Sequence, residues 1–380
     1  MDLALLMRGL LVVNAGSSSL KLSVLDEDDS VLAQRHLERW DGTDGIADFL
    51  ADAPDIAAVG HRVVHGGPDF SAPAVVDADV RTRIERLTDL APLHQPRALA
   101  GIDAVTELLP DVPQVACFDT AFHHTLPAAA RTYALPARWR KAWDLRRYGF
   151  HGLSHAYAAR RATELGGGSR VVTCHLGAGC SLAAVRDGRS VDTTMGFTPL
   201  AGLVMATRSG DVDPGLLVWL LHNGKLDVSD LADGLEHESG VRGLAGNADL
   251  RDVHRAADSG SRDAALALEV FVHRLRQGIA AMAASLGGLD LLVFTGGVGE
   301  HDAVVRSQTV AGLGFLGVEL DARRNAARSA DALVSSAGSA VGVWVVEARE
   351  DVEIADGVRR TIGIRRGDSG AGRDDARGGG

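Results

Sequence analysis

Two segments about half a chain apart share one pattern, an apolar run rich in β-branched residues followed by a turn of small residues. They are Leu10–Lys21 (LLVVNAGSSSLK) and Arg170–Leu182 (RVVTCHLGAGCSL), and a third apolar run, Leu289–Glu300 (LDLLVFTGGVGE), also ends in small residues. The first two superpose without gaps, so that Gly16 falls on Gly177, Val24 on Val185 and Asp26 on Asp187. We interpret both as strand–turn–strand hairpins whose tips present backbone N–H groups outward. Such a repeat predicts two similar domains that face one another, although strand-plus-glycine turns also occur in unrelated α/β proteins.

Helical patterns separate the predicted strands. Apolar residues recur at helical spacing in Pro96–Leu109 and Asp263–Leu286, and Ser154–Leu165 begins with a serine that we expect to cap the helix. Asp321–Ala330 is predicted as a further helix. Strands that alternate with helices indicate an α/β protein whose sheets are covered by helices. The segment from Gly367 has little apolar content, and we expect it to be disordered.

Composition argues against several classes of protein. The 380 residues are 46% hydrophobic and 23% charged, which is typical of a soluble globular enzyme long enough for two domains. The net charge of −11 argues against nucleic-acid binding, because a protein of that class normally presents a basic face. Three cysteines without paired spacing indicate neither a disulfide framework nor a zinc site, and they fit a reducing cytosol. The apolar runs are too short to span a membrane, and we expect no export signal in Met1–Leu11, where Met7 is an alternative start.

The first predicted hairpin combines the groups that a phosphate site needs. Asn14–Lys21 (NAGSSSLK) brings free N–H donors, three hydroxyls and a lysine into one stretch, and such turns bind phosphate oxygens. A plain hairpin turn favours the same residues, so this segment by itself does not decide between the two. The P-loop pattern G-x-x-x-x-G-K-[ST] and the protein-kinase motifs are absent from the sequence. Gly177-Ala178-Gly179 opens like a dinucleotide fingerprint, but Leu182 occupies the third glycine position, which argues against dinucleotide binding.

Two arginines lie in apolar or small-residue segments. Arg62 belongs to HRVVHGG (His61–Gly67), and an unpaired cation in such an apolar stretch is costly. A bound anion would remove that cost, while a lone arginine is more often a partner in a surface salt bridge. Arg208 belongs to ATRSGD (Ala206–Asp211). Two arginines in separate glycine-rich loops can clamp a carboxylate and a phosphate.

An aspartate and two histidines complete the set of candidate polar residues. Asp119 follows the predicted strand Val112–Phe118, where a carboxylate is well placed to bind a metal ion or, alternatively, to cap the next turn. His151 and His155 are four residues apart, a spacing that suits zinc on a helix, but Gly152 argues against a regular helix there. We expect one histidine to face a ligand and the other to orient a loop.

Taken together, these segments closely resemble the acetate kinase family of the sugar kinase/Hsp70/actin-like ATPase superfamily. The matching stretches run in order from residue 14 to residue 300: NAGSSSLK, GHRVVHGG, CFDTAFH, RRYGFHGLSH, TCHLGAG, DTTMGFTPLAGLVMATRSGDVDP, ESGVRGL and FTGGVGE. The resemblance implies an α/β fold of two duplicated actin-like (ribonuclease H-like) ATPase domains around a central cleft. It implies an N-terminal domain over 1–123, to which 352–365 returns, a nucleotide-binding domain over 124–351 and a disordered tail over 366–380. It also implies a cytoplasmic homodimer that transfers the γ-phosphate of ATP reversibly and in line to acetate.

The resemblance implies a role for each candidate polar residue. Arg62 and Arg208 would hold the substrate carboxylate and the phosphoryl group, and Asp119 would work with magnesium and the transferring phosphate. His151 and Arg208 would stabilise the transition state, whereas His155 looks more structural. The implied magnesium set, for which manganese is an alternative ion, is Asn14, Asp119 and Glu350.

The resemblance also implies two substrate pockets. The residues around the acyl methyl group would be Val64, Leu93, Phe150 and Pro199. The ATP-binding residues would be Asn14, Lys21, His175, Gly177, Ala178, Gly179, Asp249, Leu250, Arg251, Gly297, Val298, Gly299 and His301. Four positions depart from the family's pattern, since Ala178, His301 and Arg349 stand where Asn is common and Leu250 replaces an aromatic residue. These departures leave the arginine–aspartate centre intact and concern nucleotide affinity and NTP preference.

Two other functions stay open at this point. A propionate or butyrate kinase would use the same mechanism, because one methylene in an apolar pocket changes discrimination by only about 1–3 kcal/mol. A nucleotide-sensing or filament-forming relative would bind ATP without transferring phosphate, and it would be expected to lack the arginines or Asp119. The long apolar helix near Leu266–Leu286 is a candidate for either the core or the dimer interface.

Overall fold

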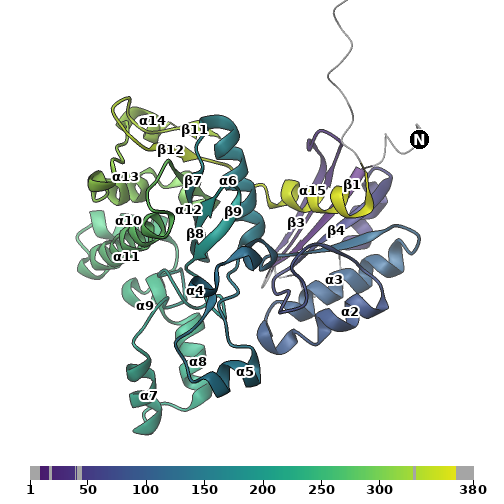
Figure 1. Cartoon of the computed structure of the whole chain (residues 1–380), viewed down its shortest axis with the longest axis horizontal. Coiled ribbons are helices and arrows are strands. Elements are labelled where there is room, and N and C mark those ends of the chain that lie inside the picture. The colour runs from purple at the N-terminus through teal and green to yellow at the C-terminus, as the bar shows by residue number, and fades with distance from the viewer. Residues whose placement is uncertain (1–8, 17–18, 39, 41–44, 328–330, 365–380) are drawn as a thin grey trace, which may run out of the picture.

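The computed structural model describes residues 9–16, 19–38, 40, 45–327 and 331–364. The alternative starts Met1 and Met7 and the segment from Gly367 therefore lie outside the described residues. Figure 1 shows two lobes side by side, and a mixed sheet forms the centre of each.

The first sheet has the strand order β3-β2-β1-β4-β6-β5. Its strands are β1 (Gly9–Ala15), β2 (Ser19–Leu25), β3 (Val31–Glu38), β4 (Ile56–Val63), β5 (Ala74–Val75) and β6 (Gln114–Phe118). The helices that follow these strands are α1 (Ile46–Asp52), α2 (Ala78–Glu85), the 3₁₀ turn η2 (Thr88–Leu90) and α3 (Gln95–Leu108). Strands β1, β4 and β6 run parallel, while β2, β3 and β5 are antiparallel to their neighbours.

The second sheet repeats this topology. Its strands are β7 (Arg170–Leu176), β8 (Cys180–Arg186), β9 (Arg189–Thr193), β10 (Leu291–Thr295), β11 (Ala332–Leu333) and β12 (Gly342–Val345). From β9 the order is β9-β8-β7-β10-β12-β11, with β7, β10 and β12 parallel and the other three antiparallel to their neighbours. The same path of strands in both sheets confirms the predicted duplication.

The gapless superposition of the two hairpins is wrong beyond the turn. In the first hairpin Asn14 pairs with Lys21, and the last pair is Ala15 with Leu20. In the second hairpin the last pair is Leu176 with Cys180, so its turn is one residue shorter. The return strand is consequently shifted by one residue, and Val24 corresponds to Ala184 rather than Val185. A one-residue shift reverses the facing of every side chain, which sequence letters alone do not reveal.

The helices of the second lobe are more numerous and cover both faces of its sheet. They are α4 (Ala128–Arg131), α5 (Ala137–Trp143), α6 (Gly152–Gly166), α7 (Pro214–His222), α8 (Val228–His237), α9 (Gly240–Ala245), α10 (Leu250–Asp258), α11 (Arg262–Leu286), α12 (Gly296–His301), α13 (Ala303–Ala311) and α14 (Ala322–Ala326), with the 3₁₀ turns η3 (Ala121–Thr125) and η4 (Gly314–Leu316). The third small-residue turn does not lead into a second strand, because β10 is followed directly by α12.

The predicted helices are present, but they begin or end at residues other than the predicted ones. Helix α6 begins at Gly152, and His151 lies before it in a left-handed conformation with φ 55°, so Ser154 is inside the helix and does not cap it. The helix predicted over Asp321–Ala330 is described only as α14, which Asp321 caps by accepting from two backbone N–H groups.

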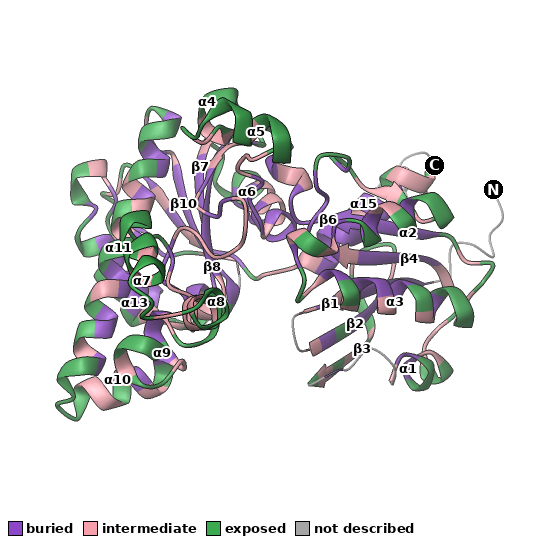
Figure 2. Cartoon of the chain, turned by 90° about the horizontal axis from the view of Figure 1, so that it is seen from below, coloured by how far each residue is buried: buried purple, intermediate pink, exposed green. Residues whose placement is uncertain are grey.

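Helix α11 belongs to the core of the second lobe. Its apolar face, including Leu275, Ile279 and Met282, is buried in the largest hydrophobic cluster together with the inner side chains of β7, β8 and β10. Figure 2 shows this contrast between the buried strands and the exposed outer faces of the helices. The core and the dimer interface were the two positions considered for α11, and most of the helix occupies the core. Leu266 near its start is 51% exposed.

Helix α15 (Glu350–Ile362) returns the chain from the second sheet to the first. It packs on β1, β4 and β6, and it also contacts α6 of the second lobe. Figure 1 shows it in yellow against the purple strands of the chain's beginning. Arg359 fixes it there, because the guanidinium donates to Asp29 Oδ1 at 2.5 Å and to the Asp26 backbone oxygen at 2.7 Å in the β2–β3 turn.

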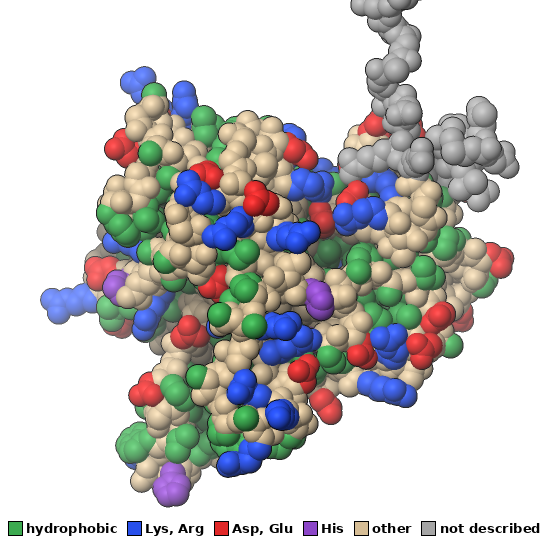
Figure 3. All heavy atoms as spheres, in the orientation of Figure 1, with side chains coloured by type: hydrophobic (Ala, Val, Ile, Leu, Met, Phe, Trp, Pro, Cys, Tyr) green, Lys and Arg blue, Asp and Glu red, His purple; other side chains and the backbone are tan. Residues whose placement is uncertain are grey.

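No helix among the described residues is long and apolar enough to cross a membrane. On the face shown in Figure 3, basic and acidic side chains are interspersed.

Candidate active site

Arg62 and Asp119 form a buried ion pair at the end of the first sheet. Because β4 and β6 are parallel neighbours, Val63 pairs with Phe118, and the Asp119 N–H donates to the Val63 oxygen at 3.0 Å. The guanidinium donates through Nε to both carboxylate oxygens at 3.2 Å and through Nη2 to Oδ2 at 2.6 Å. Arg62 thus has an anionic partner within the chain, and the pair is buried rather than at the surface, with Asp119 only 1% exposed.

Asn14 and Glu350 join this pair from two other elements. Asn14 Nδ2 donates to Glu350 Oε2 at 2.8 Å, and Arg62 Nη1 donates to Asn14 Oδ1 at 3.2 Å. Glu350 Oε2 lies 3.8 Å from Arg62 Nη1. Burial alone would raise the pKa of Glu350, but Arg62, His175, Asn14 and Lys21 together lower it below its ordinary value. Burial also raises the pKa of Asp119, while Arg62 opposes that shift.

The predicted magnesium set is therefore gathered in one place. Asp119 and Glu350 contribute carboxylate oxygens, and Asn14 contributes an amide oxygen, all within reach of Arg62. Magnesium prefers such oxygen ligands and is usually held by one or two carboxylates together with substrate phosphates. The residues fit this ion. Among the described residues, no three histidine, cysteine or acidic side chains gather to hold a metal on their own.

Arg208 lies in a loop of the second lobe next to the second hairpin. The Ala206 N–H donates to the Ala178 oxygen at 3.1 Å, which holds this loop against the turn between β7 and β8. A Cβ built on Gly179 would lie 3.0 Å from Arg208 Nη2 and 3.1 Å from His151 Cε1. The absence of a side chain at Gly179 therefore allows an arginine and a histidine to approach the turn closely.

The charge of Arg208 has no carboxylate partner within 4 Å among the described residues. Its one hydrogen bond runs from Nη1 to the Pro199 backbone oxygen at 2.7 Å. Burial lowers the pKa of Arg208 below its ordinary value. A half-buried cation with a carbonyl oxygen rather than a carboxylate beside it favours the binding of an anion.

His94 lies in the field of both arginines. Burial, followed by the charges of Arg62, Arg208 and Arg97, lowers the pKa of His94 to about 4. The surroundings of the two arginines are also connected through the backbone, because the Gly152 N–H donates to the Asp119 oxygen at 3.0 Å and the adjacent His151 lies beside Arg208 at Gly179. Sequence reasoning selected the neighbouring Leu93 and missed His94. The one available signal for His94 was its position next to Leu93 in the segment LHQP.

The two histidines near the start of α6 do not form a zinc site. His151 Nδ1 lies 2.9 Å from Ser181 Oγ, and His155 Nε2 lies 2.7 Å from the same oxygen. His155 Nδ1 is taken by Thr173 Oγ1 at 2.7 Å, so no ring nitrogen of His155 is left for a metal. Ser154, which was expected to cap the helix, instead bonds His175 Nδ1 through its hydroxyl at 2.7 Å.

The predicted ATP-binding segments of the second lobe lie side by side. Strands β7 and β10 are parallel neighbours, with His175 opposite Thr295, so the turn Gly177–Gly179 lies beside the start of α12. A Cβ on Gly296 would lie 2.8 Å from the Leu176 oxygen, whereas one on Gly297 would meet no atom within 4 Å. Open space above Gly297 suits the approach of a ligand to the backbone.

Asp249, Leu250 and Arg251 lie at the start of α10. Asp249 accepts from the Arg251 N–H at 2.9 Å, and the exposed Arg251 guanidinium folds back onto the same carboxylate. Leu250 is buried in the largest hydrophobic cluster, and His254 Nε2 of α10 lies 2.9 Å from Oδ2 of Asp302, the residue directly after α12. His301, at the end of α12, is exposed.

The residues predicted around the acyl group are partly brought together. Val64 and Phe150 belong to one buried cluster, and Pro199 is the residue whose oxygen binds Arg208. Leu93 is 45% exposed, but the segment it belongs to is docked beside Val64, since Gln95 Nε2 donates to the His65 oxygen at 3.0 Å.

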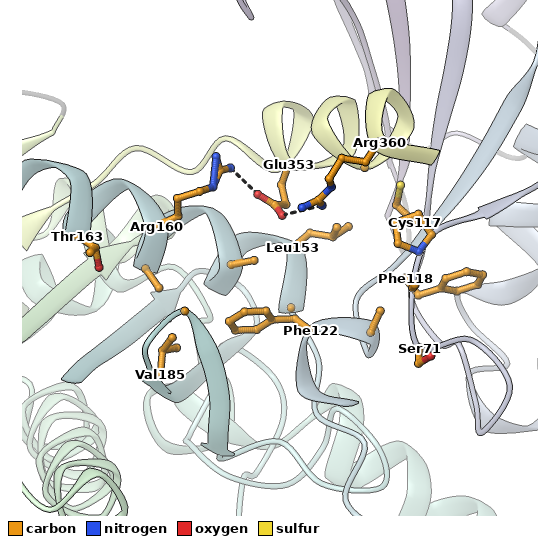
Figure 4. Close-up of a pocket in the computed structure, with 18 of the residues that line it drawn as sticks. Ser71, Cys117, Phe118, Phe122, Leu153, Arg160, Thr163, Val185, Glu353 and Arg360 are labelled. Atoms are coloured by element: carbon orange, nitrogen blue, oxygen red, sulfur yellow. Dashed lines mark hydrogen bonds and ion pairs between the residues drawn. The ribbon is translucent and has the colours of Figure 1, made fainter. Parts of the chain in front are cut away.

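A cavity lies outside this group of residues. It has a volume of about 890 Å³ and is lined by residues of α6 and α15. Figure 4 shows Glu353 between Arg160 and Arg360, with ion-pair distances of 2.5 Å and 3.9 Å. None of the candidate catalytic residues lines this cavity.

The comparisons with known proteins agree with this arrangement. The model of the acetokinase family matches residues 43–356. An acetate kinase from Nostoc punctiforme is 46% identical over 90% of this chain and 85% of its own length. The crystal structure of Porphyromonas gingivalis acetate kinase superposes with a TM-score of 0.86 at 36% identity, covering 93% of this chain and all of that one. A propionate kinase from Francisella tularensis gives a TM-score of 0.85 at 35% identity, covering 93% and 100%.

Proposed function

The chain belongs to the acetokinase family, and on that premise we propose that it transfers the γ-phosphate of ATP to acetate, giving acetyl phosphate and ADP. The transfer is reversible and direct, because no step needs a covalent enzyme intermediate. The observation that carries the proposal is the pair of arginines, with Arg62 held by Asp119 on one lobe and Arg208, on the other lobe, without a carboxylate within 4 Å among the described residues.

Arg208 and Arg62 neutralise the charge that gathers on the reacting groups. Arg208, with its unmatched charge, would bind the phosphoryl group, and Arg62 would hold the acetate carboxylate beside it. His151 lies next to Arg208 and would stabilise the transition state together with it. In-line transfer between two anions depends mainly on such positioning and on positive charge at the equatorial oxygens.

Magnesium, with manganese as a substitute, would be held by Asp119 and Glu350, with Asn14 beside them. Magnesium bound there would supply positive charge toward the phosphate groups of ATP. The chain's own residues orient these ligands, since Asn14 bonds Glu350 and Arg62 bonds Asp119.

ATP would lie along the second lobe. The turn Gly177–Gly179 and the start of α12 at Gly297–Gly299 offer backbone N–H groups for phosphates, which Asn14 and Lys21 of the first hairpin would contact from the other lobe. His175 stacks on His151 with ring centroids 4.2 Å apart, which supports a place for it at the phosphate end. The adenosine side would be formed by Asp249, Leu250, Arg251 and His301.

A hydroxamate assay for acyl phosphate with ATP, Mg²⁺ and acetate tests the reaction. We expect acetyl phosphate to form. Bound ATP without acyl phosphate would favour the non-catalytic alternative, against which the presence of Arg62, Asp119 and Arg208 argues. The propionate kinase among the similar structures supports a comparison of kcat/KM for acetate, propionate and butyrate, in which we expect acetate to be preferred.

We also propose the division of the chain into two domains, 1–123 with 352–365 and 124–351. It is supported by the two sheets and by the packing of α15 on β1, β4 and β6. A cytoplasmic location is supported by the need for ATP and by three cysteines that are all free and buried.

A homodimer is supported by an exposed apolar face on the second lobe. None of the nine residues of α7 is buried, although its sequence is PGLLVWLLH, and Val218 and Trp219 are more than half exposed. Figure 1 shows α7, α8 and α5 together at one extremity, where Val228 and Trp143 are also exposed. An apolar helix without a partner favours association, and a second copy of the chain offers the same surface.

A further inference from the structure

Ser181, on β8, connects two histidines through one hydroxyl group. Its Oγ lies 2.9 Å from His151 Nδ1 and 2.7 Å from His155 Nε2. The second nitrogen of His155, Nδ1, lies 2.7 Å from Thr173 Oγ1, and that hydroxyl lies 3.4 Å from the Ala183 backbone oxygen. Ser181, His155 and Thr173 are completely buried, so each of their protons is shared within this set.

The three short contacts are compatible with two directions of hydrogen bonding, and the contact of the Thr173 hydroxyl with the Ala183 oxygen favours one of them. A carbonyl oxygen can only accept, so the Thr173 hydroxyl donates to Ala183 and its oxygen then accepts from His155 Nδ1–H. A neutral imidazole carries one ring proton, which leaves His155 Nε2 to accept from the Ser181 hydroxyl. Ser181 has then used its only proton, and its oxygen accepts from His151 Nδ1–H.

The surroundings of both rings favour the neutral form. Burial, and after it the neighbouring histidines and arginines, lowers the pKa of His151 well below 6.5. Burial, together with His123 and His175, does the same for His155. The assignment of one proton to each ring is therefore consistent with the environment of both.

We propose that Ser181, His155 and Thr173 are positioning residues that fix His151 as the Nδ1–H tautomer, so that Nε2 presents its lone pair to the catalytic cleft. The position of Nε2 supports this, because a Cβ on Gly179 would lie 3.2 Å from it and 3.0 Å from Arg208 Nη2. The inference rests on the proposed function, in which His151 meets the phosphoryl group beside Arg208.

The fixed tautomer determines where His151 gains a proton. Nδ1 already carries one that points at Ser181, so a proton taken from solvent when the anionic phosphoryl group enters goes to Nε2. The resulting imidazolium donates from Nε2 to a phosphoryl oxygen and adds a full positive charge beside Arg208. The opposite neutral tautomer would donate to the ligand without that charge. Orienting groups of this kind act through the tautomer, as the aspartate of a catalytic triad does.

Histidine labelled with ¹⁵N in the full-length protein gives a direct readout of the tautomer. The His151 signals are identified by their loss in His151→Asn. In the wild type we expect the proton on Nδ1. In Thr173→Val, which keeps the shape but removes the acceptor for His155 Nδ1–H, we expect both histidines to shift toward the Nε2–H form. Thr173→Ser should restore the wild-type form, and Thr309→Val, a buried threonine on α13, serves as the matched control.

Steady-state kinetics then separates positioning from stability. Loss of groups that orient a functional histidine costs roughly 10–100-fold in metal sites, and we expect kcat to fall by about that factor in Thr173→Val and Ser181→Ala. KM for ATP should change little, and Thr173→Ser should recover kcat. An unchanged tautomer in both variants would overturn the relay, and a changed tautomer with wild-type kcat would overturn its role in catalysis. Wild-type turnover of His151→Asn would contradict the proposed function instead, while the NMR result still decides the tautomer.

Discussion

The guanidinium of Arg349 donates to the backbone oxygen of Asp29 at 2.9 Å and so ties the start of α15 to the β2–β3 turn. The residue before it is held from the other lobe, because the Ala348 N–H donates to Glu300 Oε1 at 3.0 Å. The chain thus passes from one lobe to the other between two neighbouring residues, each anchored on its own side. Glu350 follows immediately, so its carboxylate is positioned by the Arg349 anchor.

Arg349→Ala should therefore weaken the proposed magnesium site. We expect the Mg²⁺ concentration for half-maximal rate to rise roughly 10-fold, as for other groups that orient metal ligands, with KM for acetate little changed. Arg255→Ala is the matched control, since Arg255 is 78% exposed and pairs only with Asp252 in the same helix. Equal Mg²⁺ dependence of both variants would show that Arg349 does not position Glu350.

Arg208→Ala removes the cation that has no carboxylate partner among the described residues. We expect kcat to fall about 10²–10³-fold, because a group that stabilises transition-state charge is lost, while ATP affinity measured by calorimetry changes modestly. Arg208→Lys should recover only part of the rate, since a lysine cannot bind in the forked geometry. Turnover at the wild-type level in Arg208→Ala would exclude this residue from the reaction.

Gly179→Ala tests the close approach of Arg208 and His151 to the β7–β8 turn. The new methyl group would lie 3.0–3.2 Å from both side chains, so at least one has to move. We expect kcat to drop roughly 10-fold or more, since a displacement of about 1 Å in a catalytic group can cost 10²-fold, with a small change in melting temperature. Gly234→Ala in α8 is the control, because its methyl would meet nothing within 4 Å. Similar kcat values for Gly179→Ala and Gly234→Ala would contradict the close approach of Arg208 and His151 to the β7–β8 turn.

Trp219→Glu should disrupt the proposed homodimer. A charge in the centre of an apolar interface is costly, so we expect the mass from light scattering after gel filtration to fall from two chains to one. Phe315→Glu is the matched control, since Phe315 is 75% exposed in η4, between α13 and α14 at the end of the lobe away from α7. A monomeric wild type, or a dimeric Trp219→Glu, would place the interface elsewhere or remove it.

The fold could be predicted from the sequence because local sequence patterns indicate the duplication. Apolar runs, small-residue turns and helical periodicity identify β1, β7, β10 and α11, and the ordered motifs identify the family. The register of the two hairpins could not be predicted, because it depends on the length of each turn. The turn before Leu20 is one residue longer than the turn before Cys180.

The sequence names candidate site residues but does not give their contacts. The sequence placed Arg62 and Asp119 among the candidates, yet the bidentate pair between them depends on β4 and β6 being neighbours, which is a tertiary property. The same holds for Ser181, whose role follows only from two histidines that meet at its hydroxyl. His94 has no distinguishing pattern, since its charge environment comes from two distant loops.

Acidification should destabilise the protein through its buried histidines. Burial lowers the pKa of His61, His65 and His123 from 6.5 to about 4. Between these values the unfolded chain binds more protons than the folded one, so the free energy of unfolding falls as the pH drops from about 6.5 to 4. Each histidine contributes on the order of 3 kcal/mol when the shift is complete.

Urea unfolding between pH 8 and pH 4.5 measures this loss. Carboxylates with lowered pKa, such as Asp249 at about 2, act mainly below about pH 4.5, whereas Asp119 and Glu353, whose pKa burial raises, oppose the effect of the histidines. His61→Gln removes one titrating ring that is bonded to Gln114, and we expect a shallower pH dependence in that variant. A free energy of unfolding that stays constant over this window would mean that the buried rings gain protons without leaving the folded state.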